Sequence, residues 1–210
     1  MKTNAFTLAE VLITLGIVGV VAVMTMPTVI KHHQQQVTVN RLKHTYSTLS
    51  QAIKLSETEN GFVKEWDEAR SIGIETWLNR YLLPYIKYNS KYKSGSDTNI
   101  KLTNGIVLKF IPDQTQVQVG VYLNGNFGNT HAGRDYFVFF IGYPPTSAKD
   151  RIFKDSNSPI IPYDYISGPV DLSRTKRYYI SNFSCNKNNK YGCAALIMLD
   201  GWKISKDYPW

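Results

Sequence analysis

The chain opens with a long run of apolar residues that is interrupted by one charge. From Val11 to Met26 nearly every side chain is apolar, Pro27 closes the run, and Glu10 is the single formal charge between residues 6 and 26. An α-helix needs about 20 apolar residues to cross the roughly 30 Å of hydrocarbon in a bilayer. The run therefore predicts a membrane-spanning helix that carries a carboxylate, and ionisable groups inside a membrane are usually functional.

Beyond Pro27 the pattern becomes that of an amphipathic helix. Apolar side chains recur at steps of three and four residues, which places them on one helical face: Val39, Leu42, Tyr46, Leu49 and Ile53. Asn60-Gly61 is a natural helix stop. We therefore expect one helix from residue 6 to about residue 59, with residues 28–60 forming its soluble half.

The next segment predicts a second amphipathic helix, followed by a polar loop. Apolar side chains between Val63 and Leu83 supply a helical face, and Pro84 ends it. Residues 87–93 then interleave lysine with tyrosine. Such a run can hold single-stranded nucleic acid by stacking and phosphate contact. Because no nucleic-acid motif accompanies it, we favour a solvated loop and do not expect nucleic acid as a partner.

From residue 100 onward the pattern is that of short β-strands. Five segments rich in β-branched and aromatic residues are separated by Gly, Asn or Pro: Ile106–Ile111, Gln116–Leu123, Asp135–Ile141, Arg177–Ile180 and Ala194–Leu199. We expect them to form an antiparallel sheet that packs on the soluble half of the long helix. The predicted fold class is therefore α+β, with residues 61–210 as one globular domain.

Composition and the absence of known motifs limit the kinds of activity that the sequence suggests. The 24 Lys and Arg against 16 Asp and Glu give a net charge of +8, which we attribute to solubility. The two cysteines, Cys185 and Cys193, either form a disulfide that staples the polar loop between them or stay as free thiols. The chain has no nucleophile-elbow, zinc-protease, phosphate-loop or dinucleotide motif and no cluster of Cys and His. We therefore expect neither an enzyme nor a bound metal or other cofactor.

Three kinds of N-terminal segment fit part of the pattern: a cleavable secretory signal, a plain signal anchor and a class III signal. The apolar run is too long for the first and lacks its A-x-A site, and the second leaves Glu10 unexplained. A short polar leader, Met1 to Ala5, precedes Phe6-Thr7-Leu8-Ala9-Glu10. Glu10 is the fifth residue after that junction and Pro27 the twenty-second. This arrangement resembles the N-terminus of type IV pilins and type II secretion pseudopilins.

The resemblance implies a processing and assembly site. In that family a prepilin peptidase removes the leader, here residues 1–5, and methylates the new amine, so the expected scissile bond joins Ala5 and Phe6. The family usually has Gly where this chain has Ala5. Residues 6–27 would then be the transmembrane and assembly helix, in which Glu10 pairs with the α-amino group of Phe6 between neighbouring subunits. Gly19 and Pro27 match positions between which the helix unwinds in assembled filaments.

A loop in the second half of the chain also resembles pseudopilins. It runs from Asn124 to Asp135 and continues into Tyr136-Phe137. Calcium prefers several carboxylate oxygens, and Asp135 is the one acidic residue there. We therefore favour a turn built by Gly and Asn over a calcium site.

The predicted function is that of a structural subunit of a type II secretion or type IV pilus filament. The expected partners are a prepilin peptidase, other pilin or pseudopilin subunits, and the membrane. The resemblance implies one pass through the bacterial inner membrane, with the domain periplasmic or extracellular. Two other hypotheses stay open at this point: a minor pilin that acts as a surface or DNA-binding module, and a membrane-anchored enzyme.

Overall fold

The structure is a computed structural model, and it describes residues 7–113, 115–143, 151–153, 156–165 and 174–210. The chain divides into two compact units, Met1–Val37 and Thr38–Trp210.

The first element is the helix α1, which runs from Leu8 to Asn60 and contains Pro27. It confirms the single long helix predicted from the apolar run and the amphipathic stripe. In the second unit, Leu42, Leu49 and Ile53 of that stripe are fully buried. Gly61 follows with a φ of 76°, a left-handed conformation that favours glycine and ends the helix.

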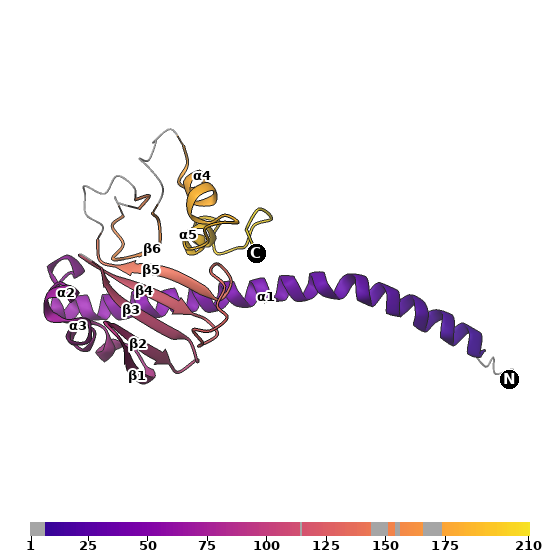
Figure 1. Ribbon diagram of the computed structural model, residues 1–210, viewed down its shortest axis with the longest axis horizontal. Helices are drawn as coiled ribbons and strands as arrows, with labels where there is room; N and C mark the ends of the chain where they lie inside the picture. The colour runs from indigo at the N-terminus through magenta and orange to yellow at the C-terminus, as the bar shows by residue number, and fades with distance from the viewer. Residues whose placement is uncertain (1–6, 114, 144–150, 154–155, 166–173) are drawn as a thin grey trace. The chain divides into compact units, whose positions relative to one another are not determined.

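In the described part of the chain six strands form one antiparallel sheet, in which every strand pairs with its neighbours along the chain (Figure 1). The order from edge to edge is β1 (Tyr88–Ser94), β2 (Asp97–Leu102), β3 (Val107–Asp113), β4 (Gln116–Tyr122), β5 (Tyr136–Ile141) and β6 (Ile160–Pro162). β3, β4 and β5 confirm the three predicted strands between residues 106 and 141.

The core lies between this sheet and the part of α1 that belongs to the second unit. Phe110, Val119 and Phe139 are cross-strand partners in one row and are all fully buried. The ring of Tyr46 on α1 lies 5.9 Å from that of Phe139. The predicted α+β layout, a long N-terminal helix and an antiparallel sheet packed on its soluble half, is therefore present and matches a pilin-like fold.

The second predicted helix, Val63–Leu83, was wrong as one continuous element. The segment forms η1 (Val63–Glu65), α2 (Ala69–Ile72), α3 (Ile74–Tyr81) and η2 (Leu83–Tyr85). Gly73 separates α2 from α3 because its φ of 82° does not occur in a right-handed helix. The aromatic side chains still pack as core residues, and Trp66 stacks on Tyr81 with ring centroids 4.6 Å apart.

Two predicted strands near the C-terminus are helical instead. Residues 177–180 belong mostly to α4 (Lys176–Tyr179), which passes into the π-helical segment η3 (Ile180–Ser184), and residues 194–199 belong to α5 (Cys193–Leu199). Thr175 caps α4 by accepting a hydrogen bond from the Tyr178 N–H at 3.2 Å. A short apolar run fits a strand and a buried helix equally well, and α5 is buried along most of its length.

The predicted polar loop at residues 87–93 was also wrong, because β1 occupies it. Neither β2 nor β6 was predicted. The side chains of β1 are mostly exposed, so its sequence has no alternation of apolar and polar residues. Only its pairing with β2 identifies it as a strand.

Candidate functional site

The N-terminal turn of α1 holds Glu10 through Thr7. The Glu10 Oε2 atom accepts hydrogen bonds from the backbone N–H and the hydroxyl of Thr7, both at 2.8 Å. The Glu10 N–H donates to Thr7 Oγ1 at 3.3 Å. Each side chain thus accepts a hydrogen bond from the backbone N–H of the other residue, which is the arrangement called a capping box at a helix N-terminus.

The capping box adds Thr7 to the residues expected at this site. Its signal, Thr-x-x-Glu ahead of an apolar run, was present in the sequence. Both bonds from Thr7 use Oε2, and within the described residues Glu10 Oε1 accepts none. The arrangement therefore fixes the carboxylate at the start of the helix and leaves one oxygen for a further donor.

The apolar helix around this carboxylate presents its side chains outward. Leu8 is 79% exposed and Leu12 61%. By length and composition α1 is apolar enough to cross a membrane, and none of its most apolar window is buried. A Cβ atom added at Gly19 would meet no atom within 4 Å beyond the helix's own backbone and the adjoining residues, and α1 continues through Pro27. Ala5 and Phe6, the predicted processing site, lie outside the described residues.

The two cysteines form a disulfide. Cys185 follows η3, Cys193 begins α5, and both are buried. Of the two states that the sequence left open, the structure has the bridged one. It packs closely on Gly133, where an added Cβ atom would lie 3.0 Å from Cys193 Sγ.

The loop from Asn124 to Asp135 is held by its own hydrogen bonds. Asp135 Oδ1 accepts from the His131 N–H at 2.5 Å, and Oδ2 accepts from Asn124 Nδ2 at 3.3 Å. Gly125 and Asn129 have positive φ values of 68° and 55°, as expected of a turn built by Gly and Asn. Among the residues that the structure describes, no three His, Cys, Asp or Glu side chains are grouped to hold a metal ion.

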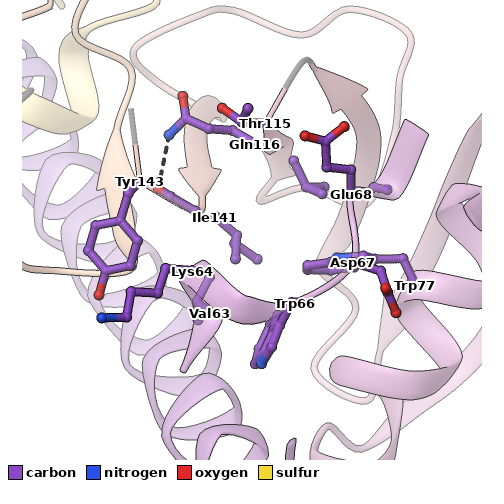
Figure 2. Close-up of a pocket in the computed structure, with 13 residues that line it drawn as sticks. Val63, Lys64, Trp66, Asp67, Glu68, Trp77, Thr115, Gln116, Ile141 and Tyr143 are labelled. Atoms are coloured by element: carbon purple, nitrogen blue, oxygen red, sulfur yellow. Dashed lines mark hydrogen bonds between the residues drawn. The ribbon is translucent and has the colours of Figure 1, made fainter. Parts of the chain in front are cut away.

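A cleft of about 420 Å³ opens between the 63–69 segment and the ends of β4 and β5. Figure 2 shows Lys64 and Tyr143 on one side of it and Glu68 on the opposite side. The carboxylate of Asp67, which also lines the cleft, already accepts from Arg80 NH1 at 2.7 Å and from the Tyr81 hydroxyl at 2.8 Å. The carboxylate of Asp67 is therefore already engaged within the fold.

A buried ion pair is the most unusual polar feature of the second unit. The side chains of Arg151 and Asp164 are both fully buried, and Arg151 Nε donates to Asp164 Oδ1 at 2.5 Å. The guanidinium lies over the rings of Phe140, 4.6 Å from its centroid, and Tyr165, at 4.3 Å. It also donates to Gln116 Oε1 at 3.0 Å. Buried charges need such pairing, and these contacts supply it for Nε and Nη1 of Arg151, whereas Nη2 has no hydrogen-bond partner among the described residues.

The fold and the N-terminal turn define a class of protein: an α+β protein with an apolar N-terminal helix, one carboxylate in its first turn, and a six-stranded antiparallel sheet. A model of a family of unknown function, DUF6613, matches residues 28–210, so the chain belongs to that family. The match begins directly after Pro27 and leaves the apolar segment outside it. No curated protein and no solved structure matches the chain.

Proposed function

We propose that the chain is a structural subunit, a pilin or pseudopilin, of a type II secretion or type IV pilus filament. The observation that carries this proposal is the carboxylate of Glu10, held in the first turn of an exposed apolar helix. The α+β layout, the polar leader and the position of Pro27 support it. The proposal places the apolar helix in the bacterial inner membrane and the domain on its periplasmic or extracellular side.

In the proposed mechanism, removal of residues 1–5 by a prepilin peptidase creates an α-amino group on Phe6. The Glu10 carboxylate of one subunit then pairs with that amine on its neighbour. In a low-dielectric environment an unpaired charge is costly, so only the register that brings amine and carboxylate together avoids the cost. Thr7 contributes by holding the carboxylate at the start of the helix.

The disulfide agrees with this placement of the domain. Disulfides form and persist in oxidising compartments such as the bacterial periplasm and are rare in the cytosol. The bridge between Cys185 and Cys193 thus favours an exported domain.

Processing is tested by expressing the full chain with an active prepilin peptidase and with a catalytically inactive form of the same enzyme. With the active enzyme we expect a mature protein that begins at methylated Phe6, as determined by mass spectrometry of the N-terminal peptide. The inactive enzyme should leave Met1 in place. An intact Met1 in the presence of the active enzyme would contradict the proposal. Ala5→Gly, which restores the residue usual in the family, should be processed at least as fast.

The alternative, a minor pilin whose surface binds DNA, depended on the run of Lys and Tyr at residues 87–93. In the structure Lys91 and Lys93 both contact the carboxylate of Glu75, at 3.2 and 2.5 Å. This pairing reduces the positive charge available to phosphates. We therefore rank the DNA-binding module second; binding of the protein to single-stranded DNA that weakens steeply with salt would reverse the ranking.

A further inference from the structure

The edge strand β1 presents an unusually open backbone. It is the outermost strand of the sheet, and among the described residues it pairs with β2 alone. β1 is seven residues long and has no proline, and all its side chains except the half-buried Lys91 are exposed. The outer edge of such a strand offers a row of N–H and C=O groups that a further strand can pair with.

The opposite edge of the sheet is protected in the usual way. β6 has three residues, all buried, and it ends at Pro162, which has no N–H to donate. Short length and proline are the features by which natural proteins prevent pairing at sheet edges. Of the two sheet edges that the structure describes, β1 is therefore the more open to another strand, most of all over Ser90–Ser94, beyond the register shift between Tyr88 and Ser90.

Lysine side chains on an edge can also prevent pairing, but on β1 they are drawn away. Lys91 Nζ contacts Asn79 Oδ1 at 3.0 Å and Glu75 Oε1 at 3.2 Å, and Lys93 Nζ contacts Glu75 Oε2 at 2.5 Å. Glu75 and Asn79 both belong to α3. The lysine heads therefore point toward that helix, and the backbone of β1 stays accessible.

The charge around this edge favours one kind of added strand. The exposed Lys87 and Lys101 form no ion pair within the described part of the chain, and Lys101 lies opposite Ser90 in the β1–β2 register. With Lys91, Lys93 and Lys109 they outnumber the neighbouring carboxylates among the described residues, Glu75 and Asp97, of which Asp97 lies opposite Ser94 and pairs with Lys109. Acidic side chains on an incoming strand would balance this excess, because opposite charges on neighbouring strands stabilise a sheet. Tyr88 and Tyr92, which are 40% and 42% exposed, offer apolar rings to its other residues.

A second copy of the chain does not fit this edge. Two β1 strands related by a two-fold axis normal to the sheet must centre on one residue. Centring on Ser90, Lys91 or Tyr92 brings lysine opposite lysine: Lys87 against Lys93, Lys91 against itself, or Lys91 against Lys93. Like charges directly opposite destabilise a sheet. Pairing of β1 with the β6 of another copy is opposed by the length and the proline of β6.

We propose that the outer edge of β1 accepts an extended acidic segment of a different protein as an additional strand. Backbone hydrogen bonds supply the affinity of such strand addition, and alternate side chains supply the specificity. The proposal does not depend on membership of a filament.

The test uses the full chain in detergent micelles and a synthetic heptapeptide of alternating valine and glutamate, compared with the same peptide containing lysine in place of glutamate. At saturating acidic peptide we expect backbone amide exchange in Tyr88–Ser94 to slow about tenfold, as hydrogen bonding protects amides, with no change in β6. The lysine peptide should have no effect. Equal protection by both peptides, or none by the acidic one at millimolar concentration, would overturn the proposal.

Variants separate charge selection from folding. K87E/K101E should abolish protection by the acidic peptide, whereas the matched control K54E/K206E, which reverses two exposed lysines elsewhere, should keep it. Protection of Tyr88–Ser94 that rises with protein concentration and without peptide would identify a second copy as the occupant and refute the proposal. Displacement of the acidic peptide by oligodeoxythymidine, with no amide protection of its own, would identify a phosphate-binding surface and refute it as well.

Discussion

The hydroxyl of Thr7 donates to Glu10 Oε2 at 2.8 Å and accepts from the Glu10 N–H at 3.3 Å. Thr7 and Glu10 therefore define each other's position at the start of α1. Within this turn the carboxylate has a fixed orientation, and a donor on another molecule meets an oxygen that is already positioned. Glu10 thus has two properties that a substitution can change one at a time: an oxygen that accepts hydrogen bonds from Thr7, and a negative charge.

Substitutions at Glu10 and Thr7 distinguish the role of the charge from that of the hydrogen bonds. Glu10→Gln keeps an oxygen that accepts from Thr7 but removes the charge, so the proposed function predicts a loss of subunit cross-linking of about tenfold or more, since a buried unpaired amine is costly. Thr7→Ser keeps the capping hydroxyl and should assemble like the native chain. Cross-linking in membranes of cells with an active assembly system measures both.

The exposed Glu68 provides the matched control. Glu68→Gln removes a carboxylate outside the apolar helix and should leave cross-linking unchanged. If Glu10→Gln assembles as well as this control, the charge of Glu10 has no part in assembly.

The disulfide leads to a prediction about stability. Cys185 and Cys193 are 8 residues apart, and closing so short a loop in the unfolded chain is worth about 2 to 3 kcal/mol by loop-entropy arithmetic. The double variant C185A/C193A should lower the free energy of unfolding in urea by about that amount. Reductant should lower the free energy of unfolding of the native protein toward that of the variant and should not change that of the variant. A variant whose free energy of unfolding still falls with reductant would contradict this account.

Asp207 gives the chain a pH dependence at its C-terminal tail. Arg177 donates to both carboxylate oxygens of Asp207, at 3.0 and 3.1 Å, and with Ser205 lowers the pKa of Asp207 from 3.8 to about 2. Because the folded pKa lies below the unfolded one, the stabilisation is complete above pH 4 and is lost as the pH falls toward 2. Since Asp207 is 58% exposed, we expect less than about 1 kcal/mol after solvent screening.

This pH dependence is measured by urea unfolding at pH 7, 4 and 2. Asp207→Asn should lower the free energy of unfolding at pH 7 and reduce its fall between pH 4 and 2. Asp113→Asn is the control, because Asp113 lies 3.9 Å from Arg70 in a looser pair. An unchanged pH profile in Asp207→Asn would show that the Arg177 contact does not contribute.

The buried pair of Arg151 and Asp164 leads to the largest predicted effect. Removing one partner leaves a buried charge without its counterion, so Asp164→Asn and Arg151→Met should each lower the free energy of unfolding by about 3 to 5 kcal/mol. The double variant R151M/D164N should be more stable than the sum of the single losses predicts. Urea unfolding of the four proteins measures this coupling, and strictly additive losses would show that the two side chains act independently.

Much of the fold could be predicted from local patterns. The apolar run and the three-and-four stripe of α1 repeat over enough residues to identify a helix, and the alternation in β3, β4 and β5 identifies strands. Two segments were harder to predict from local patterns. Near Gly73, one residue with positive φ divides what would otherwise be a single helix. At Ala194–Leu199, a short apolar run does not distinguish a helix from a strand. β1 became a strand through pairing with β2, which no local pattern at residues 88–94 encodes.

The sequence by itself determined the apolar helix and its single carboxylate, because these depend on neighbours within one or two helical turns. Tertiary structure alone decided that Cys185 is bridged to Cys193, that Arg151 meets Asp164, and that β1 lies at an edge. The cysteine spacing left two states open, and local spacing does not relate Arg151 to Asp164 or place β1 at an edge. These outcomes follow from strand order and from burial in a shared core. For that reason the carboxylate near the start of the apolar helix could be located in advance, whereas the open edge of the sheet could not.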